Sequence, residues 1–317
     1  MTEEEIVAIK EAHEKYLELG PWNLSIILSN EFRIHVSTMS IYRVLYPDKY
    51  QTLISDVKDN EIKFYEKHRP YAMFHMDTMK VRLESGKIIY QFSIEDDYSR
   101  GYMALCVFNH KHSYFTIITI LHACRSYSKP HLLHRDNGRE LKNGVVTRLL
   151  DMLKIVDVPT KVRNPKGNGK KENGHKQDRK YFYEKYHFNN INDVEKKIPK
   201  YLKFHNEVKG QWARYGQTVG SILEDVESDP LTDEELEQII SELYFKKVER
   251  VVKQNGKVKF EDKWYHLSKK MAGKTVEIRI TLRGVEIWND GSFLKRWRYW
   301  EYVLGIAADY TLKKYLL

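Results

Sequence analysis

The spacing of hydrophobic and polar residues changes twice along the chain. In the first twenty residues apolar side chains recur every three or four positions, and Thr2 with Glu5 fits a capping box at the start of a helix. Two further short helices are predicted over 22–29 and 38–45, on either side of a polar turn. This order outlines a helix-turn-helix, whose last helix would enter a DNA groove. The same pattern is equally typical of a small packed bundle, and both interpretations stay open.

A second pattern follows, in which runs rich in β-branched and aromatic residues precede an alternation of helices and strands. The predicted elements are, in order, strands over 71–83, 88–94 and 102–108, a helix over 113–124, a strand over 131–134, a helix over 140–153, a strand over 156–162 and a helix from about 170 to 186. This order predicts an α/β fold with a mixed sheet covered by helices.

The last third of the chain begins with an acidic stretch over 223–242. Thr232 and Glu235 form a second capping box there, which predicts a helical linker. Beyond it the hydrophobic period becomes two, and the dipeptides Asn255-Gly256 and Asp290-Gly291 predict hairpins with type I′ turns, as in a small β-barrel. The expected domains are therefore a helix-turn-helix domain (1–50), a linker (51–70), an α/β catalytic core (71–223), an acidic helical linker (224–245) and a DNA-binding β-barrel (246–317).

Charge and composition narrow the class of partner. The net charge is +9, and it is concentrated: nine Lys or Arg accompany three acids over 160–187, and fifteen accompany six over 246–300. Two basic surfaces predict an anionic partner. No apolar run reaches the ~20 residues that cross a bilayer, and the N-terminus lacks a signal-peptide pattern, so a cytoplasmic protein without a membrane partner is expected. Cys106 and Cys124 lie in apolar stretches, which excludes a disulfide framework and a cysteine-rich zinc site.

Three acidic residues are candidates for phosphoryl-transfer chemistry, which needs carboxylates from different elements to converge on two divalent ions. Asp77 lies within an apolar strand, Asp136 ends a strand before the tight turn Asn137-Gly138, and Glu172 begins a helix after a glycine-rich stretch. Local hydrogen bonds or capping would explain each acid taken singly. Their spacing is more specific, with 58 residues between the first two acids and 35 between the last two.

This combination resembles the catalytic signature of the DDE transposases of the retroviral-integrase superfamily, whose core is RNase H-like. The stretch 97–100 (Asp-Tyr-Ser-Arg) resembles the family's Asp-x-Ser-Arg after the second strand, and 165–172 resembles its Gly-Lys-x-Glu approach to the third acid. The likeness covers about 74–223, although Val219 stands where a proline is common. Residues 1–70 contain no cysteine, unlike the zinc domain of retroviral integrases, so the resemblance is closest to transposases of bacterial insertion sequences and Mu-like phages.

The resemblance implies a DNA transposase or integrase that cuts DNA at element ends and joins the cut strand to a target by metal-dependent polynucleotidyl transfer. Asp77, Asp136 and Glu172 would be the catalytic residues and would hold two Mg²⁺ or Mn²⁺ ions. The implied partners are double-stranded DNA, further copies of the chain on paired ends and an accessory ATPase, since the chain has no Walker A motif. In a prokaryote such a protein would associate with the nucleoid.

Basic and aromatic residues outside the triad are expected to contact DNA. Lys176 and Arg179 follow Glu172 by four and seven residues, which places them on the same helical face. In the family, a basic residue at the second of these positions touches DNA near the cut; solvated surface charge is the alternative. The expected DNA contacts are Lys170, Lys176, Arg179, Lys180, Tyr42, Arg43, Lys295, Arg296 and Arg298. The tryptophans of the last domain are expected mostly in its core.

Two other functions stay open at this stage. A nuclease of related chemistry would cut DNA without joining strands. A domesticated or regulatory DNA-binding protein would use only the helix-turn-helix and the basic barrel. The presence of all three acids favours an enzyme over the second alternative.

Overall fold

The computed structural model describes residues 1–47, 67–136, 138–141, 143–159, 169–211 and 214–316, with only the backbone described over 169–173. Most of the predicted linker and the basic glycine-rich stretch before Glu172 therefore lie outside the described residues. The chain divides into two compact units, which are described separately: residues 1–107 with 163–227, and residues 108–162 with 228–317.

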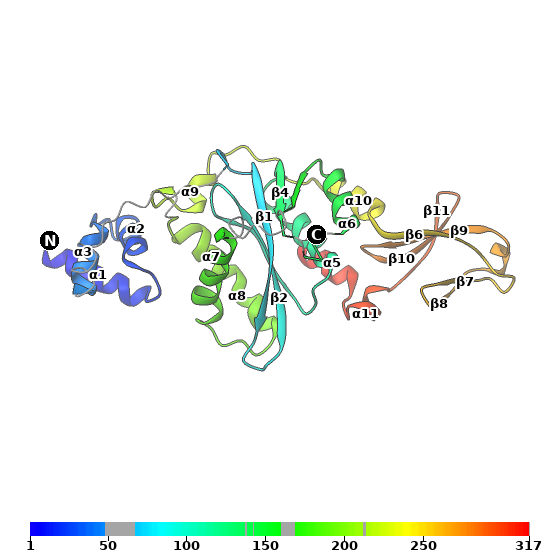
Figure 1. Ribbon diagram of the computed structural model, residues 1–317, viewed down its shortest axis with the longest axis horizontal. Helices are drawn as coiled ribbons and strands as arrows, with labels where there is room; N and C mark the ends of the chain where they lie inside the picture. The colour runs from blue at the N-terminus through cyan, green and yellow to red at the C-terminus, as the bar shows by residue number, and fades with distance from the viewer. Residues whose placement is uncertain (48–66, 137, 142, 160–168, 212–213, 317) are drawn as a thin grey trace. The chain divides into compact units, whose positions relative to one another are not determined.

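The first unit begins with the three predicted helices, α1 (Glu3–Lys15), α2 (Pro21–Glu31) and α3 (Thr38–Leu45) (Figure 1). The capping box is confirmed: the Glu5 backbone N–H donates to Thr2 Oγ1 at 3.2 Å, and the Thr2 N–H donates to Glu5 Oε2 at 2.7 Å. Side chains from all three helices fill one small core, among them Ile9, Leu28 and Ile41, which are fully buried. Part of the apolar pattern of these helices is therefore explained by packing among them, including residues of α3.

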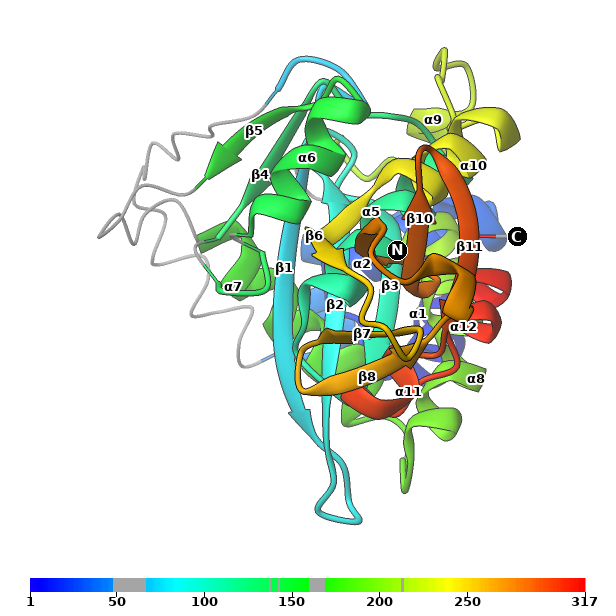
Figure 2. The same cartoon turned by 90° about the vertical axis from the view of Figure 1, so that its right-hand side faces the viewer.

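The central sheet has five strands in the order β3-β2-β1-β4-β5. Its strands are β1 (Met73–Arg82), β2 (Ile88–Asp96), β3 (Tyr102–Phe108), β4 (Leu132–Arg135) and β5 (Val156–Pro159). β1 and β2 pair antiparallel, whereas β4 and β5 pair parallel, so the sheet is mixed, as predicted. Figure 2 shows the long β1–β2 hairpin.

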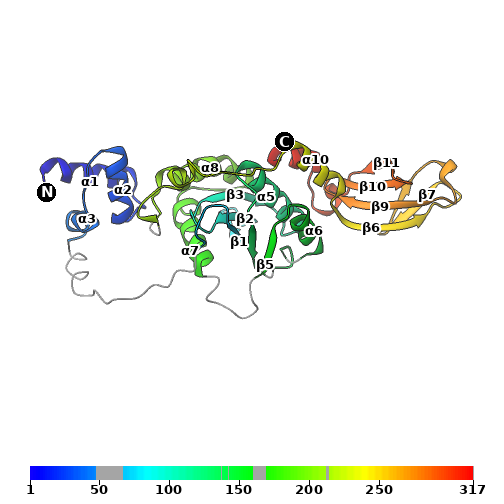
Figure 3. The same cartoon turned by 90° about the horizontal axis from the view of Figure 1, so that it is seen from above.

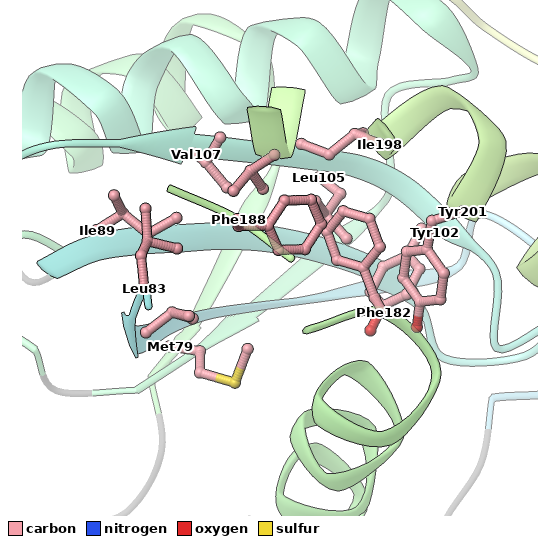
Figure 4. Close-up of a cluster of buried hydrophobic side chains, with 12 residues drawn as sticks. Met79, Leu83, Ile89, Tyr102, Leu105, Val107, Phe182, Phe188, Ile198 and Tyr201 are labelled. Atoms are coloured by element: carbon pink, nitrogen blue, oxygen red, sulfur yellow. The ribbon is translucent and has the colours of Figure 1, made fainter. Parts of the chain in front are cut away.

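The helices of the first unit differ from the prediction at one place. The expected helix over 170–186 is an α-helix only as α7 (Gly169–Asp178), and it continues as the π-helix η2 (Arg179–Tyr183). Each hydrogen bond of a π-helix spans one residue more than that of an α-helix. The side chains that follow are therefore rotated from the positions they would have in a continuous α-helix. Phe182 is thereby fully buried, with its ring stacked 4.8 Å from the ring of Tyr201 (Figure 4). α8 (Ile191–Lys203), the π-helix η3 (Phe204–Val208) and α9 (Val219–Leu223) complete the unit.

The second unit places α5 (Ser113–Ser126) and α6 (Gly144–Met152) with β4 and β5. The predicted helix over 140–153 begins later, because the Asn143 side chain accepts from the Val145 N–H and caps the helix there. Both cysteines are buried, as predicted, and burial raises the pKa of the Cys124 thiol to about 12. Among the described residues, no helix has the length and apolar character to cross a membrane.

The acidic stretch forms α10 (Asp233–Glu242) with the predicted capping box, and the Glu235 N–H donates to Thr232 Oγ1 at 3.2 Å. The helix also packs within its unit, because Leu236, Ile239 and Ile240 are buried. Two short helices, α11 (Trp300–Val303) and α12 (Ala308–Tyr315), end the described chain (Figure 2).

The C-terminal strands form two sheets, and the predicted small β-barrel is not confirmed. β6 (Tyr244–Val251), β9 (Thr275–Thr281), β10 (Gly284–Asn289) and β11 (Ser292–Trp297) make one sheet, and β7 (Lys257–Phe260) with β8 (Lys263–His266) makes the other. The turn at Asp290-Gly291 is confirmed, with φ of +48° and +75°. The predicted turn at Asn255-Gly256 forms, with the Lys253 N–H donating to the Lys257 carbonyl at 2.9 Å and Gly256 at a φ of +74°, but the strands on either side pair elsewhere, β6 with β9 and β7 with β8.

The tryptophans of this region are less buried than predicted. Trp300 is 2% exposed and donates its indole N–H to the Thr281 carbonyl at 2.9 Å. Trp288 and Trp297 are only partly buried, and Trp264 is 43% exposed beneath the Lys253 ammonium. The expectation that most of them form the core is therefore wrong, since aliphatic residues such as Ile278 and Ile287 fill the interior instead.

Candidate active site

Asp77 lies in the middle of β1, opposite Ser93 of β2. Its side chain is 16% exposed, and its Oδ1 atom accepts the backbone N–H of Thr78 at 2.7 Å. Its Oδ2 atom faces His175 of α7, with 3.5 Å between Oδ2 and the imidazole Nε2. The first unit thus holds one half-buried carboxylate with an oxygen directed at α7, the helix that carries Glu172. Figure 3 shows α7 beside β1 and β2.

Asp136 directly follows β4 and is half-buried. Its Oδ1 atom accepts the backbone N–H of Gly138 at 2.7 Å, which folds the chain into a turn and holds the carboxylate at the strand end. Gly138 is required by close packing, because a Cβ there would lie 2.9 Å from Asp136 Oδ1. The preceding Arg135 is buried, and its Nε donates to Asp157 Oδ1 of β5 at 2.8 Å, which joins the ends of the two strands.

Glu172 lies on α7, as predicted, but its side chain is outside the described residues. The same holds for the side chain of Lys170. Lys176, Arg179 and Lys180 are exposed. Arg179 is the first residue of the π-helix. Its separation of seven residues from Glu172 therefore no longer implies that the two residues share a face of a regular α-helix. Its contact with DNA stays a prediction.

The remaining predicted DNA contacts are on the surface of their own units. Arg43 is exposed and Tyr42 is half-buried on α3. Lys295, Arg296 and Arg298 are exposed near the C-terminal sheet. Arg296 is paired with Glu286, with 2.8 Å between Nε and Oε1, so part of its charge is already balanced.

The Asp-Tyr-Ser-Arg stretch after β2 is a structural turn. Asp97 is fully buried; its Oδ1 atom lies 2.8 Å from Nε2 of His75, and its Oδ2 atom accepts the Lys67 N–H at 2.7 Å. Asp96 is equally buried and accepts the N–H groups of Tyr71 and Ser99. Burial raises the pKa of the Asp96 carboxyl. These acids hold the turn that precedes β3.

Sequence reasoning missed a buried polar cluster behind α7. The Asp178 carboxylate is fully buried and accepts three hydrogen bonds, from Gln91 Nε2 at 2.7 Å, from the Tyr102 hydroxyl at 2.6 Å and from the Tyr201 hydroxyl at 2.7 Å. The Tyr183 hydroxyl donates to Oε1 of the same glutamine at 2.8 Å. These bonds fasten the C-terminal end of α7 to β2, β3 and α8. The three hydrogen bonds account for both carboxylate oxygens of Asp178.

Two basic groups are buried beside this cluster. The Lys209 ammonium donates to Oε1 of Gln177, and burial lowers its pKa to about 8, although Glu95 and Asp178 act in the opposite direction. His205 is also buried, with its ring 4.6 Å from the Tyr102 ring. Burial, reinforced by the charge of Lys209, lowers the pKa of His205 to about 3.

The low pKa of His205 makes the first unit sensitive to acid. The unfolded chain takes up this proton below about pH 6.5, whereas the folded chain does not until about pH 3, so stability is lost as the pH falls through that window. Between pH 6.5 and 5 the loss from this one group amounts to about 2 kcal/mol. We expect His205→Gln to melt at a less pH-dependent temperature than the wild-type protein over this range. An identical pH dependence in both proteins would show that His205 is not buried in the neutral form.

The donor atoms suit a hard divalent cation, as two-metal chemistry requires. Carboxylate oxygens are the ligands that Mg²⁺ prefers, and Asp77 and Asp136 each use one oxygen for a backbone N–H and retain the other. Within the part of the chain that the structure describes, His175 Nε2 beside Asp77 is buried and has no hydrogen-bond partner. Within the described residues no cluster of three or more potential ligands is found.

Residues 67–165 match the family model described as integrase core domain. No curated protein sequence matches the chain. A solved structure of the HTLV-2 integrase catalytic core domain in complex with magnesium is similar at 17% identity and a TM-score of 0.41, over 50% of this chain and 99% of that one.

Two further solved structures are similar over different lengths. The catalytic core domain of BIV integrase has 20% identity and a TM-score of 0.38, over 49% of this chain and 95% of that one. The simian T-cell lymphotropic virus intasome in complex with PP2A regulatory subunit B56 gamma has 13% identity and a TM-score of 0.45, over 92% and 99%. The matched segment, 67–165, includes Asp77 and Asp136 together with the mixed sheet that carries them. The match to an integrase core domain applies to these residues.

Proposed function

We propose that the protein is a DNA transposase or integrase that cuts DNA at the ends of a mobile element and joins the cut strand to a target. The observation that carries the proposal is the position of Asp77 and Asp136 within the integrase core domain, each half-buried at or in a strand with one carboxylate oxygen not used by the backbone. Glu172, separated from Asp136 by 35 residues and located on α7, would be the third catalytic acid.

The three acids would hold two Mg²⁺ or Mn²⁺ ions. When bound, the ions lower the barrier by activating the attacking hydroxyl and stabilising the leaving oxygen. The protein contributes rigidity: Gly138 fixes the Asp136 carboxylate at the end of β4, and Thr78 orients that of Asp77. Asp178 holds α7 against the sheet and thereby limits where Glu172 can lie. No covalent bond between protein and DNA is required.

The basic residues would bind the phosphate backbone on both sides of the cut. Lys176, Arg179 and Lys180 are exposed on or just after the helix of Glu172, which suits contacts with the DNA end. Lys295 and Arg298 would contact more distant DNA from the C-terminal sheet, and the N-terminal helices would recognise sequence. We expect further copies of the chain on paired ends and a separate ATPase as an accessory protein.

A strand-transfer assay tests the proposal and separates it from its closest alternative. DNA from the two ends of the segment that carries the gene would be end-labelled and incubated with the full chain, supercoiled target and Mg²⁺. We expect labelled target, whose formation requires joining. Cut ends without joined product would identify a nuclease, and binding without cutting would identify a regulatory DNA-binding protein.

A further inference from the structure

Among the described side chains of α7, that of His175 approaches Asp77. It follows Glu172 by three residues, a spacing that places both residues on neighbouring positions of one helical face. The imidazole is 23% exposed, and its Nε2 atom lies 3.5 Å from Asp77 Oδ2.

This contact is too long for an ordinary hydrogen bond. Protein N–H···O bonds have donor-to-acceptor distances of about 2.7–3.2 Å. The Nε2 atom is also buried and has no hydrogen-bond partner among the described residues. A buried imidazole nitrogen without a hydrogen-bond partner costs free energy. A ligand that contacts both His175 Nε2 and Asp77 Oδ2 would offset this cost.

The separation fits two ligands of one cation. Two atoms that bind an octahedral Mg²⁺ or Mn²⁺ ion at right angles, each at about 2.1 Å, are about 3 Å apart. A small side-chain rotation would bring Nε2 and Oδ2 to that separation with the ion between them. Neutral imidazole is the commonest nitrogen ligand in proteins, and Mn²⁺ binds nitrogen more readily than Mg²⁺ does.

We propose that His175 is a direct ligand of the divalent cation held by Asp77, which makes this site an oxygen-and-nitrogen site with a raised preference for Mn²⁺ over Mg²⁺. The inference rests on one part of the proposed function, namely that Asp77 holds a divalent cation. α7 has the rigidity that a ligand needs, because the buried Asp178 carboxylate, one turn further on, fastens it to the sheet.

Electron spin-echo spectroscopy of Mn²⁺ bound to the full chain tests the inference without DNA or activity, because a directly bound imidazole produces a ¹⁴N modulation. The variants are His175→Ala and Asp77→Asn. His187→Ala is the matched control, since His187 also lies beside a carboxylate, that of Glu84, but on the surface and away from α7. Mn²⁺ and Mg²⁺ affinities of each protein would be measured in parallel, with melting temperature as the check on folding.

We expect the ¹⁴N modulation in the wild-type protein and in His187→Ala, and its loss in His175→Ala. Mn²⁺ affinity should fall at least about 10-fold in His175→Ala, with a smaller loss for Mg²⁺. If Asp77→Asn abolishes Mn²⁺ binding but the wild-type signal lacks ¹⁴N modulation, or if the modulation survives in His175→Ala, the inference is overturned and the proposed function stands. Mn²⁺ binding that is unaffected by Asp77→Asn would overturn both.

Discussion

Replacing Asp136 by Asn is expected to lower strand cleavage and joining by about 10³-fold or more while DNA binding is retained. The amide keeps an oxygen for the Gly138 N–H, so the turn after β4 should persist. It removes the negative charge that would hold a divalent cation, and such a cation contributes several kcal/mol to transition-state stabilisation. Because each 1.36 kcal/mol is tenfold in rate, a large kinetic effect should follow with little change in stability.

The measurement is the yield of labelled target in the strand-transfer assay, with DNA binding measured separately by gel shift. Asp151→Asn is the matched control, because Asp151 is an exposed acid of the nearby helix α6 in the same unit. Wild-type joining by the Asp136→Asn protein would remove this residue from the catalytic set. Loss of joining in the control as well would point to a general effect of charge.

The second large effect is on folding, at Asp178. The change Asp178→Ala should destabilise the first unit by about 3 kcal/mol or more, because it leaves the Tyr102 and Tyr201 hydroxyls and the Gln91 amide buried without their acceptor, at about 1–3 kcal/mol for each unsatisfied group. For a unit of this size, that loss corresponds to a fall in melting temperature of about 6–12 °C.

Asp178→Asn isolates the role of the charge, since its amide oxygen can still accept from both tyrosines. We expect an intermediate melting temperature for this variant. Glu184→Ala serves as the control, because Glu184 is an exposed acid directly after η2. A melting temperature for Asp178→Ala equal to that of the control would show that the cluster does not hold α7.

The elements that the sequence predicted correctly are those with local causes. The capping boxes at Thr2 and Thr232 involve residues three positions apart, so they form wherever the helix forms. The turn at Asp290-Gly291 requires positive φ at two residues that tolerate it, and both strands beside it can pair directly. The three N-terminal helices and the β1–β2 hairpin followed from hydrophobic period in the same way.

The wrong predictions involve a choice among distant partners. Asn255-Gly256 forms the predicted turn, yet the strands on either side of it pair with other strands, β6 with β9 and β7 with β8. The helix after Gly169 looked continuous, but the burial of Phe182 against Tyr201 favours a π-helical turn. Hydrophobic period carries no information on which of several compatible partners is chosen.

The candidate site shows the same division. Asp77, Asp136 and Glu172 were predicted from residue type, predicted element and spacing. A strand aspartate, an Asp-Asn-Gly turn and a helical glutamate at those intervals can be read directly from the sequence. Only tertiary structure showed that His175 faces Asp77 and that Asp178 joins α7 to the sheet. Those contacts link residues some 75 to 100 positions apart, and their energies depend on burial and on hydrogen-bond geometry, which arise only when the strands and helices have packed.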